Sequence, residues 1–226
     1  MRQISVVEDP GAAVADRLTA AAQAGSHIVL TGGSTPRDAY AIAAEQDADW
    51  SRATVWFSDE RCVPPDDGDS NYGMADRALL SRLTRPPRVM RIEGELGHEA
   101  AAGAYEALLR EHFGNDPRFD LILLGMGPDA HVASLFPGKP ELEETQRFAV
   151  GVPLAGLAPQ VPRVTLTMPV LNRGREVDFL ISGAGKAQAV ARAFGDPPDP
   201  DAPAARVRPQ AGDLLVVLDE AAAASL

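Results

Sequence analysis

Short apolar runs alternate with helical patterns along the whole chain. Glu99–Phe113 carries apolar residues at Tyr105, Leu108 and Leu109, a spacing that predicts a helix. Leu121–Leu124 is apolar at every position, as expected for a strand buried on both faces of a parallel sheet. The same reasoning predicts strands at Ile4–Val7, His27–Thr31, Thr54–Phe57, Val89–Ile92, Phe148–Val152, Val164–Thr167, Val177–Ile181 and Leu214–Leu218, and helices at Ala12–Ala24, Pro36–Glu45, Asn71–Leu83, Lys186–Phe194 and Glu220–Ala224.

This alternation predicts an α/β fold with a doubly wound, mostly parallel sheet and helices on both faces. A length of 226 residues suits one domain, so we expect a single domain over residues 1–226. Pro153–Pro162 and Gly195–Pro203 hold too many prolines for a helix or a central strand, and we expect surface loops there rather than domain boundaries.

Composition narrows the possible partners and compartments. The net charge of −11 argues against nucleic acid as a partner but permits a small anionic ligand. Cys62 is the single cysteine, so no internal disulfide can form, and we interpret it as a small buried residue. We expect neither a signal peptide nor a membrane span, because no apolar run approaches 18 residues, and we therefore expect a cytoplasmic protein.

Candidate chemistry is concentrated in Phe119–Pro137, where an apolar strand ends at Gly125 and a tight loop carries Asp129 and His131. Open α/β sheets place their sites beyond the carboxyl ends of the strands, which favours a catalytic histidine at this point. The alternative is a Gly/Pro loop with a surface histidine.

A second strand, turn and helix pattern occupies Ile28–Tyr40. Gly32 and Gly33 would allow backbone N–H groups to approach an anion, beside the N-terminus of a helix. Thr35 suits the N-cap and Pro36 the first helical position, with Asp38 placed almost as in a capping box. The turn is therefore a phosphate-binding candidate, although an ordinary connection is the alternative. It is neither a Walker A loop nor a G-x-G-x-x-G motif, so we expect no nucleotide.

Two further turns carry cations. Lys186 lies in the first turn of a predicted helix, where a cation is unfavourable unless an anion lies nearby. Arg61 follows the strand Thr54–Phe57 and could bind phosphate oxygens in two-pronged fashion, while Asp59 could orient a sugar hydroxyl or a histidine. The alternative for both turns is a solvated surface, and we favour it for Glu60.

Other chemistries lack their sequence signals. Four histidines without H-x-x-x-H spacing, and no cysteine cluster, make a zinc site unexpected. No G-x-S-x-G motif supports a serine hydrolase.

The segments LTGGSTP, WFSDERCVPPDDGDSNYGMA, FDLILLGMGPDAHVASLFPG, RVTLTMPVLN and ISGAGKAQAV occur in this order, and together they resemble the 6-phosphogluconolactonase family of the glucosamine-6-phosphate isomerase/deaminase superfamily. The resemblance spans about Leu30 to Val190. It implies the deaminase-like, Rossmann-like fold and hydrolysis of 6-phospho-D-glucono-1,5-lactone in the oxidative pentose phosphate pathway, without metal or organic cofactor. The family's catalytic histidine falls on His131, and its anion-binding cations on Arg61 and Lys186.

The chain departs from the family pattern at two positions. Ala130 replaces the usual glycine before the histidine, which costs on the order of 1 kcal/mol if φ is positive there. Val132 replaces the usual threonine after it. The isomerase/deaminase branch typically shows Asp-Glu-Tyr where this chain has Asp59-Glu60-Arg61. That branch also has a different segment after the histidine. A sugar-phosphate sensor of the same fold would need a DNA-binding segment, which we do not expect here.

These observations combine into one hypothesis. His131 acts as general base for the attack of water on the lactone carbonyl, and Asp129 or Asp59 orients it. Backbone N–H groups of Gly125–Gly127 stabilise the oxyanion. The partner is a small sugar-phosphate lactone, and the chain is a monomer or a weak homo-oligomer. The proposed phosphate ligands are Gly32, Gly33, Ser34, Thr35, Arg61 and Lys186, with Arg163 as a secondary candidate.

Overall fold

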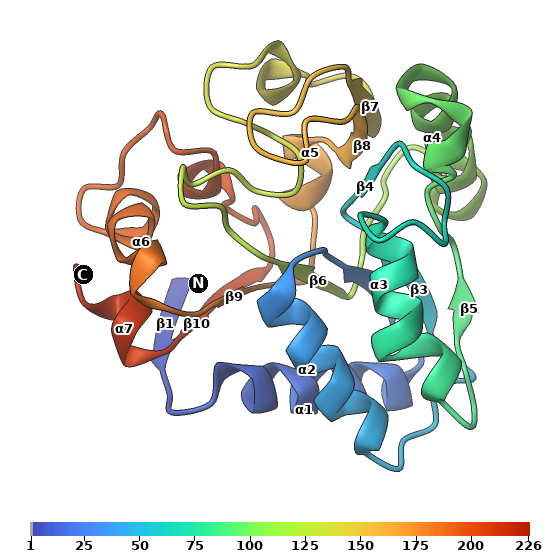
Figure 1. Cartoon of the computed structure of the whole chain (residues 1–226), viewed down its shortest axis with the longest axis horizontal. Helices are drawn as coiled ribbons and strands as arrows, with labels where there is room; N and C mark the ends of the chain where they lie inside the picture. The colour runs from blue at the N-terminus through green and yellow to red at the C-terminus, as the bar shows by residue number, and fades with distance from the viewer. Residues whose placement is uncertain (1) are drawn as a thin grey trace.

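A wholly parallel sheet of seven strands, in the order β1-β10-β9-β6-β2-β3-β5, forms the centre of the computed structural model, which describes residues 2–226 (Figure 1). Its central strand β6 is buried at all four positions, as its apolar sequence predicts. The strands are β1 (Arg2–Val6), β2 (His27–Leu30), β3 (Thr54–Phe57), β5 (Arg88–Val89), β6 (Leu121–Leu124), β9 (Glu176–Ile181) and β10 (Asp213–Leu218).

Helices cover both faces of this sheet, and the predicted doubly wound fold is confirmed. Helices α1 and α2 lie on one face, and α6 lies on the other (Figure 1). None of the helices within residues 2–226 has the length and apolar character needed to cross a membrane. The helices are α1 (Pro10–Ala24), α2 (Ser34–Glu45), α3 (Asn71–Ala78), α4 (His98–Phe113), α5 (Met168–Leu171), α6 (Ala187–Phe194) and α7 (Glu220–Ala223), and single 3-10 turns occupy Leu80–Arg82, Gly94–Leu96, Pro140–Glu143, Ala184–Lys186 and Pro203–Arg206.

A second sheet was not predicted. It contains β4 (Asp59–Arg61), β8 (Arg163–Leu166) and β7 (Ala149–Val152), paired antiparallel in the order β4-β8-β7. We call it the small sheet; it lies on the same side of the large sheet as α6, and α4 packs against it (Figure 1). The prediction that Glu60 is solvated is wrong, because pairing with β8 leaves only 3% of Glu60 exposed.

The start of α2 and the end of α3 also differ from prediction. Helix α2 begins at Ser34, with Gly33 at the N-cap, so Thr35 is not the cap and Pro36 is not the first helical residue. The expected capping box is absent from this helix start, since Gly33 has no side chain to donate or accept. Helix α3 ends at Ala78, and a separate 3-10 turn follows it.

Candidate functional site

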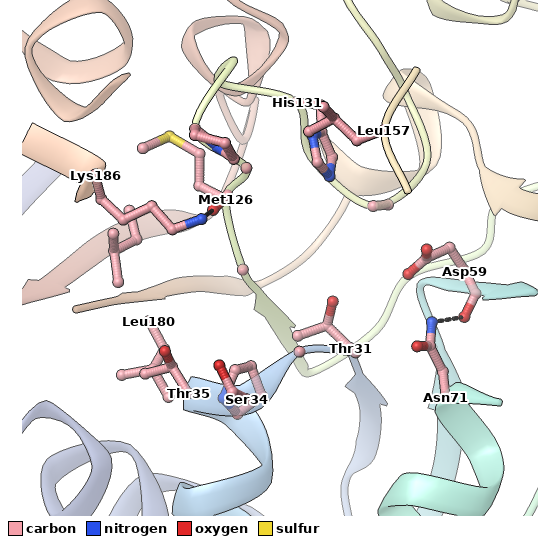
Figure 2. Close-up of a pocket in the computed structure, with 18 of the residues that line it drawn as sticks. Thr31, Ser34, Thr35, Asp59, Asn71, Met126, His131, Leu157, Leu180 and Lys186 are labelled. Atoms are coloured by element: carbon pink, nitrogen blue, oxygen red, sulfur yellow. Dashed lines mark hydrogen bonds between the residues drawn. The ribbon is translucent and has the colours of Figure 1, made fainter. Parts of the chain in front are cut away.

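A cavity of about 280 Å³ lies beyond the carboxyl ends of β2, β6 and β9, where the large sheet faces the small sheet (Figure 2). This is the position at which open α/β sheets bind ligands. The polar and charged residues that line it are Thr31, Ser34, Thr35, Asp59, Arg61, Asn71, His131, Arg163, Ser182 and Lys186.

The His131 imidazole is held by Asp129. Its Nδ1 lies 2.6 Å from Asp129 Oδ1, and the same oxygen accepts the His131 backbone N–H at 3.1 Å. Because a carboxylate can only accept, Nδ1 carries the proton of the neutral imidazole, and Nε2 of that form keeps its lone pair. Burial alone would raise the pKa of the Asp129 carboxyl, but the hydrogen bonds and charge of His131 outweigh it and the pKa is lowered.

The loop backbone explains how two neighbouring residues make this contact. A Cβ on Gly127 would lie 2.1 Å from His131 Nδ1, so only glycine leaves room for the ring. The Gly127 N–H donates to the His131 carbonyl at 3.1 Å and is therefore not available to an oxyanion, contrary to the prediction. Ala130 has φ +67°. Its backbone is therefore in the left-handed region, where alanine carries the strain described in the sequence analysis. Val132 is fully buried.

The turn after β2 brings the N-terminus of α2 to the cavity. Gly33 has φ +112°, a conformation that favours glycine. A Cβ on Gly32 would lie 2.0 Å from Asn71 Oδ1, so any larger residue there would displace the Asn71 side chain. The hydroxyls of Ser34 and Thr35 lie beside this turn (Figure 2). The predicted phosphate turn is thus at the cavity, although its helix starts two residues earlier than expected.

Asp59 lies on the opposite wall and does not orient His131. Its Oδ1 accepts from the Ser58 hydroxyl at 2.9 Å, and its Oδ2 accepts from the Ser134 hydroxyl at 2.7 Å. Asp59 is 4% exposed and lines the cavity. Of the two aspartates considered from the sequence, Asp129 makes the contact with the imidazole.

Arg61 and Arg163 are directly opposite each other on β4 and β8. Like charges at such a position repel, and both side chains line the cavity. Within residues 2–226, each has a buried Nε without a hydrogen-bond partner. Burial, and secondarily the charge of Arg61, lower the pKa of Arg163, although Asp59 opposes this. The pair therefore brings two guanidinium groups to the cavity wall.

Lys186 approaches the cavity from the turn before α6. Its Nζ donates to the Met126 carbonyl at 2.6 Å, beside the His131 loop (Figure 2). Burial lowers the pKa of Lys186, and the charge of Asp129 partly offsets that effect. Lys186 thus supplies a half-buried cation near the histidine.

Asn71 is a lining residue that sequence reasoning did not identify. Its Nδ2 donates to the Asp59 carbonyl at 3.0 Å (Figure 2), and Glu60 accepts its backbone N–H at 2.7 Å. Glu60 also accepts the N–H of Tyr72 at 2.7 Å and the Ser70 hydroxyl at 3.0 Å, so it caps α3. Burial raises the pKa of Glu60 despite these hydrogen bonds. The Ser-Asn pair at the start of a predicted helix was the sequence signal for this arrangement.

Cys62 does not line this cavity. Cys62 is half-buried, and burial together with the charge of Glu60 raises the pKa of its thiol to about 11, which opposes thiolate chemistry. Residues 2–226 contain no group of three or more His, Cys, Asp or Glu side chains placed to hold a metal ion.

Comparison with known proteins gives consistent matches. The family model described as glucosamine-6-phosphate isomerases/6-phosphogluconolactonase matches residues 3–216. A human protein named 6-phosphogluconolactonase is 45% identical over 188 residues, covering 81% of this chain and 72% of its own. A Streptomyces coelicolor protein of the same name is 39% identical over 221 residues, covering 91% and 84%. The crystal structure of 6-phosphogluconolactonase from Thermotoga maritima has a TM-score of 0.84 at 33% identity, covering 96% of this chain and all of that one.

Proposed function

The chain belongs to the glucosamine-6-phosphate isomerase/6-phosphogluconolactonase family, and from this premise we propose that it hydrolyses 6-phospho-D-glucono-1,5-lactone to 6-phospho-D-gluconate. The reaction is an ester hydrolysis and the second step of the oxidative pentose phosphate pathway. The observation that carries the proposal is His131, whose Nδ1 is held by Asp129 while Nε2 is free at a cavity rich in cations.

The substrate phosphate binds to the cations and to the start of α2. Arg61 and Arg163 contribute guanidinium groups, and Lys186 contributes an ammonium. A helix N-terminus adds its dipole and backbone N–H groups. Binding the phosphate, which does not react, fixes the lactone carbon near the histidine, so that binding energy is used for positioning. The residues of the turn that take part are Gly32, Gly33, Ser34 and Thr35.

The chemistry then needs one proton acceptor. His131 Nε2 takes a proton from water as the water oxygen attacks the lactone carbonyl carbon, and Asp129 stabilises the resulting imidazolium. The tetrahedral intermediate collapses by breaking the bond from that carbon to the ring oxygen. The imidazolium returns its proton to this oxygen, which leaves a carboxylic acid and a hydroxyl. The acid then ionises to the carboxylate and releases its proton to solvent. With the Gly127 N–H occupied, the N–H groups of Gly125 and Met126 remain as candidate donors to the oxyanion.

The composition of the chain supports a cellular compartment and a class of partner. One cysteine and no possible internal disulfide support a reducing compartment, the cytoplasm. A net charge of −11 supports a small-molecule partner rather than nucleic acid. Residues 1–226 form one domain that works as a monomer or a weak homo-oligomer.

The test is acid release from freshly generated 6-phosphogluconolactone, followed by pH-stat. Unphosphorylated gluconolactone and glucosamine 6-phosphate serve as parallel substrates. We expect hydrolysis well above the spontaneous rate with the phosphorylated lactone only. Ammonia release from glucosamine 6-phosphate without lactone hydrolysis would assign the chain to the deaminase branch, and inactivity on all three would contradict an enzymatic role.

A further inference from the structure

Ser134 is fully buried three residues after His131, and its side chain does not line the cavity. It nevertheless contacts two side chains that do, Asp59 and Arg163. We infer that Ser134 is a positioning residue that holds the Asp59 carboxylate toward the substrate's hydroxyl groups. The inference rests on the proposed function, since it assigns a role to Asp59 in that same cavity.

The hydroxyl of Ser134 stands between an anion and a cation. Its one proton is donated to Asp59 Oδ2 at 2.7 Å, and its oxygen accepts from a terminal nitrogen of Arg163 at 3.5 Å. The Ser134 backbone N–H donates to the Thr165 hydroxyl at 3.2 Å, which fixes the serine against β8. The serine therefore bridges a carboxylate and a guanidinium that belong to neighbouring strands of the small sheet.

The Ser134 bridge determines which groups the Asp59 carboxylate can bind. Within residues 2–226, the two oxygens of the Asp59 carboxylate are bonded to the hydroxyls of Ser58 and Ser134 rather than to Arg61 or Arg163. Each carboxylate oxygen can accept a further hydrogen bond, so Asp59 keeps acceptor capacity for sugar hydroxyls. Without the Ser134 hydroxyl, Asp59 would turn toward Arg163, and both groups would be withdrawn from the substrate.

Arg163 is restrained from its other side. The same guanidinium donates to the carbonyls of Leu157 and Pro159, each at 3.1 Å, in the loop that closes one side of the cavity. A shift of Arg163 toward Asp59 would break these bonds and displace Leu157, which lines the cavity. Ser134 therefore positions Asp59 directly and also keeps Arg163 in place.

The experiment is a double-mutant cycle of Ser134→Ala and Asp59→Asn. Each variant is measured as kcat/KM on the phosphorylated lactone and as Kd for 6-phosphogluconate by calorimetry. In the wild-type background Ser134→Ala should lower kcat/KM about tenfold, the loss typical of one hydrogen bond to a charged group. In the Asp59→Asn background the same change should alter kcat/KM and Kd by less than about twofold, because the group through which Ser134 acts is already altered.

Thr167→Val is the matched control. It removes another buried hydroxyl, which donates to the Arg147 carbonyl at 2.8 Å and lies outside the cavity. We expect it to lower the denaturation midpoint without changing kcat/KM. If Ser134→Ala does not fold, Ser134→Cys keeps the volume but donates weakly and enters the same cycle.

The outcomes separate the inference from the proposed function. A wild-type protein without lactonase activity would contradict the function itself. An active wild type with Ser134→Ala within about twofold of it, or with an equal loss in both backgrounds, would overturn the positioning role alone.

Discussion

The two walls of the cavity are built in different ways. The sheet-end wall consists of the turns after β2, β6 and β9, namely Gly32–Thr35, Gly125–His131 and Ser182–Lys186. The small-sheet wall consists of Asp59, Arg61, Asn71 and Arg163. On the first wall the key contact joins residues two apart, His131 and Asp129, whereas on the second the Asp59–Ser134 bond joins residues 75 apart.

This difference separates two kinds of catalytic contribution. The sheet-end wall offers a histidine, glycine-rich backbone and a helix N-terminus, all positioned by local chain geometry. The small-sheet wall offers buried charges, which are costly to bury and need partners supplied by distant segments. We therefore expect changes at His131 and its loop to affect the chemical step, and changes on the small-sheet wall to affect substrate binding.

His131→Asn should produce the largest effect. Removing a general base costs about 10²- to 10⁴-fold, so kcat should fall by at least 10², while Kd for 6-phosphogluconate changes only a few-fold. Steady-state kinetics and calorimetry measure the two quantities, and His98→Asn, outside the cavity, is the control. A kcat within about threefold of wild type would remove His131 from the role of base.

Arg61→Ala should produce the next largest effect, on the opposite wall and in binding. Loss of a guanidinium that contacts a phosphate should raise KM and Kd for 6-phosphogluconate about tenfold or more, with kcat changed less than about threefold. Arg37→Ala, an exposed arginine paired with Asp38, removes the same charge outside the cavity and should change neither. An unchanged KM for Arg61→Ala would exclude Arg61 from the phosphate site.

The sequence predicts the sheet-end wall better than the small-sheet wall, because only the sheet-end wall is positioned by local chain geometry. The strands of the large sheet and the Asp129–His131 loop carry local signals: apolar runs, glycines and short spacings. β4 carries none, because Asp-Glu-Arg has the composition of a solvated turn and becomes a strand only through pairing with β8. Glu60 is the clearest case, since its capping contacts with Asn71 and Tyr72 require the chain to fold back on itself.

A titration of ligand binding should distinguish the cations of the two walls. Because burial lowers the pKa of Lys186 below the ordinary 10.5, its charge is lost as the pH rises through that lowered value. The phosphate is fully ionised above pH of about 8, so Kd for 6-phosphogluconate should rise up to about tenfold between that pH and 10.5. Lys186→Arg keeps its charge and should bind with little change over this range. An equal slope in both proteins would show that another group titrates.

Ala130→Gly tests the smallest effect, the strain stored in the sheet-end wall. An alanine at φ +67° costs about 1–2 kcal/mol relative to ordinary backbone, and glycine removes that cost. Ala189→Gly in α6 is the matched control, because Ala189 is also buried and loses the same methyl group from a helical backbone. Denaturant unfolding should therefore show Ala130→Gly more stable than Ala189→Gly by at least about 1 kcal/mol. Equal losses would mean that the loop holding His131 carries no such strain, and that local geometry positions this wall without a cost in stability.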